Sequence, residues 1–127
     1  MPTETATKHA SLVILMIESE QPEGISSRKL VVETAKHNVL TAYRPDTGLA
    51  LLRRFPAVDA ILVHASVLDH LPLIPQLHEI SPEIPIIVTA PRATEHFDGA
   101  DYTVSSHEPQ QLLDLLARIF GVSKSSD

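Results

Sequence analysis

Five short apolar runs, separated by amphipathic stretches, constrain the fold of this chain more than any other feature of its sequence. The runs are Leu12–Ile17, Val39–Ala42, Ala60–Val63, Ile84–Thr89 and Tyr102–Val104. The first, third and fourth are rich in Val and Ile, which is typical of strands buried on both faces of a parallel sheet. The pattern therefore predicts an α/β domain rather than a β-sandwich.

The stretches between these runs carry the start and stop signals of helices. Short polar residues stand where an N-cap side chain is wanted, and asparagine or proline stands where a helix should stop. We expect a first helix with a cap at Ser26 or Ser27 and an end near His37, and a second with a cap at Asp46 or Thr47 and a stop at Pro56.

The last amphipathic stretch is the clearest helix of the sequence. Pro109 presets its first turn, apolar residues from Leu112 to Phe120 recur at helical spacing, and Gly121 follows as the stop. After the third apolar run, closely spaced prolines restrict a further helix to about Leu73–Glu79.

Length and composition indicate one domain. The 127 residues suit a single domain at 11–121 with flexible ends at 1–10 and 122–127. Cysteine is absent, which excludes disulfides, thiolate metal sites and cysteine nucleophiles and fits a reducing compartment. The polar start and the shortness of the first apolar run predict a cytoplasmic protein without a membrane partner.

Charge argues against nucleic-acid binding. The formal net charge is -6, and the ten Lys and Arg residues are scattered along the chain. Because no basic stripe is available to neutralise a line of phosphates, we expect no direct contact with nucleic acid.

The alternation of strands and helices predicts a doubly wound, flavodoxin-like domain. Within it, ILMIESE, VDAILVH, IPIIVTAP and GADYTVSSHEPQQLL resemble the first, third, fourth and fifth strands of the receiver domains of bacterial response regulators, over Ser11–Gly121. The resemblance implies a CheY-like sheet in the order 2-1-3-4-5 with helices on both faces. It also implies a signalling module in a phosphorelay, with a histidine kinase, an effector or another regulator as partner.

Carried over residue by residue, the resemblance assigns the receiver pocket to a set of strand-end residues. The equivalents are Glu18 and Ser19 for the acidic pair, His64 for the phosphate-accepting aspartate, Thr89 for the switch hydroxyl, Tyr102 for the switch aromatic residue and Ser105 for the lysine. Among these, Thr89 and Tyr102 match the family, whereas the acceptor and the lysine are replaced.

These replacements remove the chemistry of receiver phosphorylation. That reaction needs a carboxylate nucleophile, a magnesium ion held by oxygen ligands and a cation beside the phosphoryl group. Ser19 is neutral, His64 offers nitrogen where a hard cation prefers oxygen, and Ser105 carries no positive charge. We expect magnesium-dependent aspartyl phosphorylation to fail, and we expect no enzyme activity.

Simpler interpretations compete with each assignment. His64 suits a polar strand-end residue hydrogen-bonded to a neighbour such as Glu18, and Glu18 itself suits a solvated carboxylate. Thr89 and Tyr102 are ordinary strand residues. Ser105 and Ser106 suit loop hydroxyls that cap the last helix.

A metal site is a further alternative, because the chain has seven histidines. His64, His70 and His107 fall near the carboxyl edge of the predicted sheet, and together with Glu18 they would suit zinc better than magnesium. No tight spacing of metal ligands supports such a site, and no glycine-rich loop follows a strand. We therefore expect no metal and no cofactor.

Three functions remain open. The first is a phosphorylation-independent receiver that acts through protein contacts, the second is a response regulator that uses His64 as an unusual acceptor, and the third is a small-molecule or metal-binding flavodoxin-like domain. The segment Pro91–Asp98 leaves room for only about one or two helical turns, so the usual fourth helix is shortened. We expect the uncovered face, formed by Pro91–Phe97, Tyr102–Val104 and the last helix, to bind a partner or a second copy of the chain.

Overall fold

The structure is a computed structural model that describes residues 12–18, 37–68 and 72–121. Its five strands are all parallel and lie in the order β2-β1-β3-β4-β5. They are β1 (Val13–Ile17), β2 (Asn38–Ala42), β3 (Ala60–His64), β4 (Ile86–Ala90) and β5 (Tyr102–Ser105). The predicted flavodoxin-like sheet is thereby confirmed.

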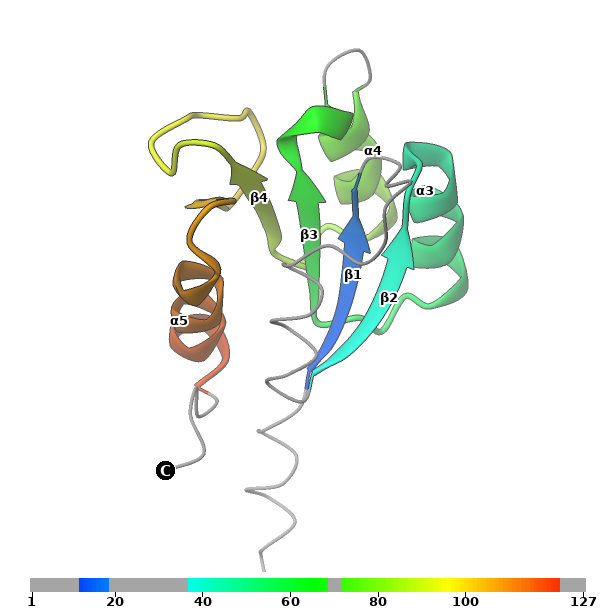
Figure 1. Ribbon diagram of the computed structural model, residues 1–127. Helices are drawn as coiled ribbons and strands as arrows, with labels where there is room; N and C mark the ends of the chain where they lie inside the picture. The colour runs from blue at the N-terminus through cyan, green and yellow to red at the C-terminus, as the bar shows by residue number, and fades with distance from the viewer. Residues whose placement is uncertain (1–11, 19–36, 69–71, 122–127) are drawn as a thin grey trace, which may run out of the picture.

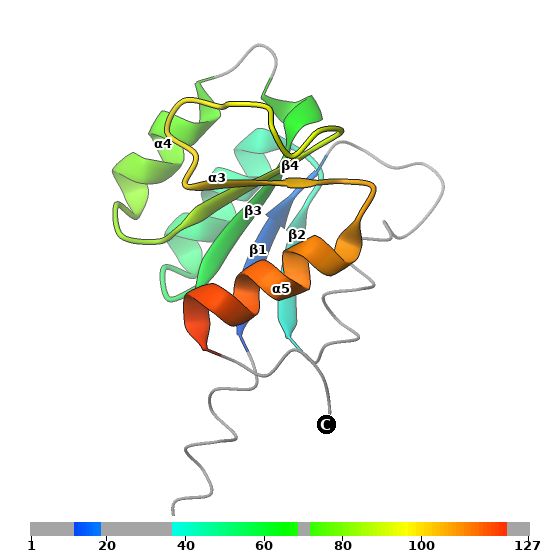
Figure 2. The same ribbon diagram turned by 90° about the vertical axis from the view of Figure 1, so that its left-hand side faces the viewer.

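Helices cover both faces of the sheet (Figures 1 and 2). The helices α3 (Pro45–Arg54) and α4 (Leu73–Ile80) lie on one face, and α5 (Pro109–Phe120) crosses the other. A 3-10 turn, η1 (Ala65–Val67), follows β3 directly. The helix predicted from Ser26 or Ser27 lies almost wholly outside the described residues.

The two layers have separate apolar cores, because side chains alternate between the two faces of each strand. Leu15 and Ile61 pack with α3 and α4, whereas Met16 and Leu62 pack with α5. All four are buried. The continuous apolar runs in the sequence thus report strands that are covered on both sides.

Two helices match their predicted bounds closely. α4 extends one residue beyond the predicted Leu73–Glu79, to Ile80. α5 begins at Pro109 and ends at Phe120, and Gly121 adopts the left-handed conformation with φ 70° while its N–H donates to the Ala117 carbonyl at 2.8 Å.

The predicted cap of α3 is wrong. The helix begins at Pro45 rather than after Asp46 or Thr47, and Arg44 occupies the N-cap position without a side-chain cap bond. Pro45 forces Arg44 into extended backbone and supplies a φ suited to the first turn. Asp46 instead accepts the Thr47 N–H at 2.9 Å, within that turn.

The predicted shortening of the helix between β4 and β5 is confirmed, and the helix is in fact absent. Residues 91–101 form turns and no helix. His78 of α4 anchors this connection, because its Nε2 lies 2.8 Å from the Gly99 carbonyl oxygen. Gly99 has φ 87°, and a Cβ there would come within 2.8 Å of Ile74, so this close approach requires glycine.

Aspartates close the amino edge of the sheet. The Asp59 carboxylate accepts the Val13 N–H at 2.8 Å, and the Asp59 N–H donates to the Val13 carbonyl at 2.7 Å. Asp101 makes the same pair of bonds with Ile86, at 2.8 and 2.9 Å. Each aspartate therefore satisfies the first N–H of a neighbouring strand.

His37, just before β2, likewise accepts a backbone N–H at the amino edge. Its Nδ1 accepts the Leu12 N–H at 3.1 Å, and the next residue, Asn38, donates its N–H to the Leu12 carbonyl at 2.7 Å. The imidazole is buried, which lowers its pKa below 6.5, and the nearby Asp59 carboxylate opposes that shift.

Candidate functional site

The carboxyl edge of the sheet brings three of the predicted site residues into one row. His64 pairs in register with Thr89, and Ile17 pairs with Val63, so the next residue, Glu18, falls beside His64. Each residue of this row lies two positions after Met16, Leu62 or Ile87, so its side chain is on the same face of the sheet, which is the face that α5 covers. Glu18, His64 and Thr89 therefore share one edge and one face.

Glu18 is a buried carboxylate. It is 2% exposed, and its N–H donates to the Ala42 carbonyl oxygen at 2.9 Å. The interpretation of Glu18 as a solvated strand-end residue is wrong, because the residue is buried at the end of β1, between β2 and β3.

His64 is half-buried and turns its ring toward η1. Its Nδ1 accepts the Ser66 N–H at 3.2 Å and lies 2.7 Å from the Ser66 hydroxyl oxygen. The imidazole thereby caps the first turn of η1. These bonds to Ser66 are local, whereas the sequence suggested Glu18 as the partner.

Thr89 carries a hydroxyl that the fold leaves without a hydrogen bond. The residue is 1% exposed, and its Oγ1 has no partner. Thr41, near the carboxyl end of β2, is in the same situation. Because burial of a hydroxyl without a hydrogen bond costs free energy, these two groups are candidates for contact with a bound molecule.

Tyr102 lies apart from the row. It is the first residue of β5 and pairs with Ile87, two residues before the row, and it is 41% exposed. Ser19 lies outside the described residues, as does His70 of the alternative metal site. Of the five pocket equivalents among the described residues, the row therefore contains three.

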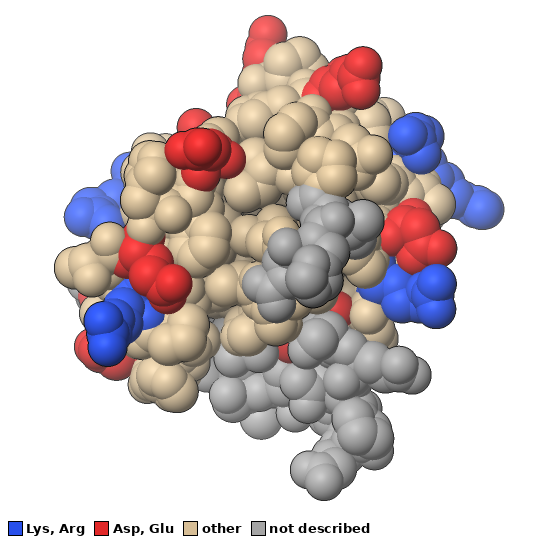
Figure 3. Space-filling view, turned by 90° about the horizontal axis from the view of Figure 1, so that it is seen from above, with Lys and Arg blue, Asp and Glu red and all other residues tan. Residues whose placement is uncertain are grey.

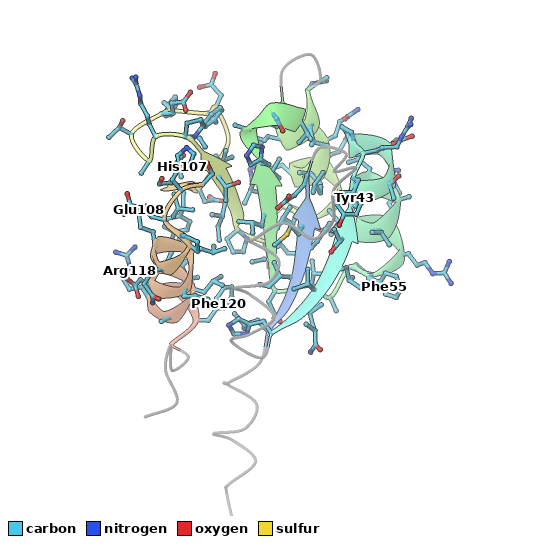
Figure 4. All side chains as sticks on the ribbon, viewed as in Figure 1. Tyr43, Phe55, His107, Glu108, Arg118 and Phe120 are labelled. Atoms are coloured by element: carbon cyan, nitrogen blue, oxygen red, sulfur yellow. The ribbon has the colours of Figure 1, made fainter. Side chains whose placement is uncertain are left out.

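Ser105 is buried and shapes the turn into α5. Its hydroxyl oxygen accepts the His107 N–H at 3.1 Å, and its own N–H donates to the Gln111 side chain at 3.0 Å. The N-cap of α5 is Glu108, without a side-chain cap bond. Ser105 therefore organises the turn that Figure 4 shows at His107 and Glu108, rather than capping the helix as expected.

The described residues bring one carboxylate, Glu18, to the row at this edge. Figure 3 shows the molecule from above, with charged side chains of the described residues around its upper and side margins. Within the described residues, no three His, Asp or Glu side chains converge as a metal site would require. Glu18 alone cannot supply the several oxygen ligands that magnesium prefers.

Sequence reasoning missed Ser66 and Thr41. Ser66 follows His64 by two residues, and this spacing of a hydroxyl after a strand-end histidine could have indicated the contact between them. Thr41 follows from register alone, since it pairs with Met16 on the face under α5. Finding it required knowledge of which strands are neighbours.

Comparison with known proteins identifies the fold. No family model matches the sequence, and no curated protein matches it. Among solved structures, a response regulator receiver domain from Clostridium thermocellum is similar, with a TM-score of 0.71 and 18% identity over 87% of this chain and 94% of that chain. A CheY-like receiver domain from Methanospirillum hungatei is also similar, with a TM-score of 0.70 and 18% identity over 87% of this chain and 94% of that chain.

A third similar structure holds a metal ion. The receiver domain of a sensor histidine kinase from Pseudomonas aeruginosa gives a TM-score of 0.73 and 18% identity over 88% of this chain and 99% of that chain. In that protein, magnesium is coordinated in the active-site cleft. At these identities the similarity establishes a receiver-type fold. No helix within the described residues is long and apolar enough to cross a membrane.

Proposed function

We propose that this chain is a receiver-like signalling module that acts through protein contacts and does not use magnesium-dependent aspartyl phosphorylation. The observation that carries the proposal is an imidazole, His64, at the carboxyl end of the central strand of a receiver-type fold. A receiver needs a carboxylate nucleophile at this place.

The neighbouring groups support the same conclusion. Glu18 is the one carboxylate that the described residues bring to the row, which leaves magnesium short of oxygen ligands. Ser105 stands where the resemblance implies a lysine, and its hydroxyl is committed to the turn before α5. A phosphoryl group here would meet no positive charge from this residue.

Phosphorylation assays test this proposal. Small phosphodonors with magnesium should leave no acyl phosphate on the chain, and beryllofluoride should barely shift the amide signals of Thr89 and Tyr102. The double variant His64→Asp with Ser105→Lys restores two of the missing groups and should respond more strongly than the unaltered chain. Stoichiometric, magnesium-dependent acyl phosphate on the unaltered chain would overturn the proposal, and so would a phosphorylated imidazole at His64.

For the output of the module, we infer self-association through the groove between β5 and α5. Thr103, Val104, Gln111, Asp114, Ala117 and Arg118 line this groove, which measures about 460 Å³. The groove borders β5, the edge strand of the sheet, in which Tyr102 is 41% exposed. The connection from β4 to β5 contains no helix that could cover this edge.

The charges of the groove favour a second copy of the chain as the occupant. Asp114 and Arg118 lie one helical turn apart and carry opposite charges, and Arg118 points away from the sheet in Figure 4. A two-fold axis beside the groove would bring Asp114 of each copy toward Arg118 of the other. The net charge of -6 repels two copies elsewhere, so a balanced patch is a preferred contact.

Light scattering across a concentration series tests the interface. Ala117→Glu places a charge in the groove and should weaken association by at least about 10-fold, which corresponds to about 1.4 kcal/mol. Ala50→Glu makes the same substitution at an exposed alanine of α3, on the opposite face of the sheet, and should leave association unchanged. A chain that stays monomeric at every concentration, or equal weakening by both variants, would contradict this interface.

A further inference from the structure

The hydrogen bond between Ser66 and His64 has a defined direction. Nδ1 of His64 receives the Ser66 backbone N–H at 3.2 Å, and a backbone N–H can only donate. Nδ1 therefore carries no proton, so at 2.7 Å the Ser66 hydroxyl must donate its own proton to this nitrogen. A hydroxyl that donates to a neutral imidazole has the arrangement of an activated nucleophile and its base.

The hydroxyl is accessible and is held at the functional edge of the fold. Ser66 is exposed, and η1 packs against β4, the strand that carries Thr89. The Thr89 hydroxyl is buried without a partner. The exposed hydroxyl of Ser66 and the imidazole of His64 therefore lie close to β4, which carries the unpartnered hydroxyl of Thr89.

The surroundings select an uncharged electrophile. Glu18 lies beside His64 by register and is buried, and Ser105 supplies no positive charge. Neither residue offers a positive charge to a doubly negative phosphoryl group. A neutral ester carbonyl needs no such charge.

We propose that Ser66 accepts an acyl group from an uncharged ester, with Nδ1 of His64 as the base. This proposal goes beyond the signalling function and does not depend on it. Ser66 Oγ forms a bond to the carbonyl carbon, and the bond from that carbon to the leaving oxygen breaks. The Ser66 proton passes to Nδ1 and then to the leaving oxygen, which departs as the neutral alcohol or phenol.

The alternative is that His64 only caps η1, and one substitution separates the two roles. In His64→Asn, the side-chain oxygen stands at about the position of Nδ1 and still accepts the Ser66 N–H, but the amide is not a base. The cap survives this change while the activation of the hydroxyl is lost. Circular dichroism and a thermal melt establish that the variant remains folded.

The experiment incubates the full chain with p-nitrophenyl acetate, then measures intact mass and maps the acetyl group by peptide sequencing. The acetyl group should lie on Ser66, be absent from Ser66→Ala and form about 10²-fold more slowly in His64→Asn. Thr94→Ala, which removes another exposed hydroxyl, should react as the unaltered chain does. Acetyl groups confined to lysines, histidines or the N-terminus would overturn the proposal, as would equal labelling of Ser66 in His64→Asn.

Discussion

The two edges of the sheet use their polar side chains differently. At the amino edge, Asp59 and Asp101 accept the N–H of the first residue of a neighbouring strand, and His37 accepts the N–H of Leu12, just before β1. At the carboxyl edge, the hydroxyls of Thr41 and Thr89 are buried without any hydrogen bond. His64 and Ser105 at the carboxyl edge also accept backbone N–H groups. The hydroxyls of Thr41 and Thr89 are the exception, because they bond to no backbone group.

The two edges also differ in their place in the fold. Ligands of doubly wound folds lie at the carboxyl ends of the strands, so hydroxyls there that bond to no backbone group are available to a bound molecule. The side chains at the amino edge satisfy N–H groups that would otherwise be buried without a partner. Removing an acceptor at the amino edge should therefore lower the free energy of unfolding, whereas removing the Thr41 or Thr89 hydroxyl should not.

The largest effect is expected at Asp59. Asp59→Ala removes the acceptor 2.8 Å from the Val13 N–H and leaves that group unsatisfied at the start of a central strand, which should lower the free energy of unfolding by about 1–3 kcal/mol. Denaturant unfolding at neutral pH measures this. Asp59→Asn keeps an oxygen acceptor at the same place and should lower the free energy of unfolding clearly less than Asp59→Ala does. If Asp59→Ala unfolds like the unaltered chain, the amino edge does not depend on its side chains.

A smaller effect should accompany a change of pH, through His37. Burial lowers the pKa of His37 in the folded state below its ordinary 6.5, against the opposing pull of Asp59. The unfolded chain therefore binds more protons, so the contribution of His37 to stability is complete above about pH 6.5 and is lost as the pH falls toward the folded pKa. Protonation of Nδ1 would also break its bond to Leu12.

Unfolding free energies measured from neutral to mildly acidic pH test this contribution. In His37→Asn, the amide oxygen can still accept the Leu12 N–H but does not titrate, so the loss of stability below pH 6.5 should be shallower than in the unaltered chain. Parallel curves for the two proteins would show that the titration of His37 does not govern acid stability.

How far the sequence predicts these features depends on their range along the chain. Runs such as Ala60–Val63 and the spacing from Pro109 to Gly121 report the burial of whole elements, and both elements were predicted within one residue. The bond between Val13 and Asp59 spans 46 residues and exists only once the strand register is known. No local pattern could have found it.

The candidate site was predictable in position but not in its contacts. The resemblance to receiver domains identified Glu18, His64 and Thr89 as strand-end residues, and the strand register brings them to one edge. The exposure of Tyr102 and the bond from His64 to Ser66 depend on side-chain packing and rotamers that periodicity does not report. The roles of these residues remain predictions.

The smallest expected change comes from Thr89→Val at the carboxyl edge, and it separates the two edges most directly. Valine has nearly the shape of threonine without the hydroxyl, and the Thr89 hydroxyl is buried with no partner, so its removal should leave the free energy of unfolding unchanged or raise it by up to about 1 kcal/mol. Thr41→Val should behave in the same way for the same reason. A loss comparable to that of Asp59→Ala would mean that the Thr89 hydroxyl is satisfied in solution, and that the carboxyl edge uses its polar groups for stability as the amino edge does. A gain in stability would instead mark Thr89 as a group that the fold retains at a cost, which is the behaviour expected of a residue kept for contact with a bound molecule.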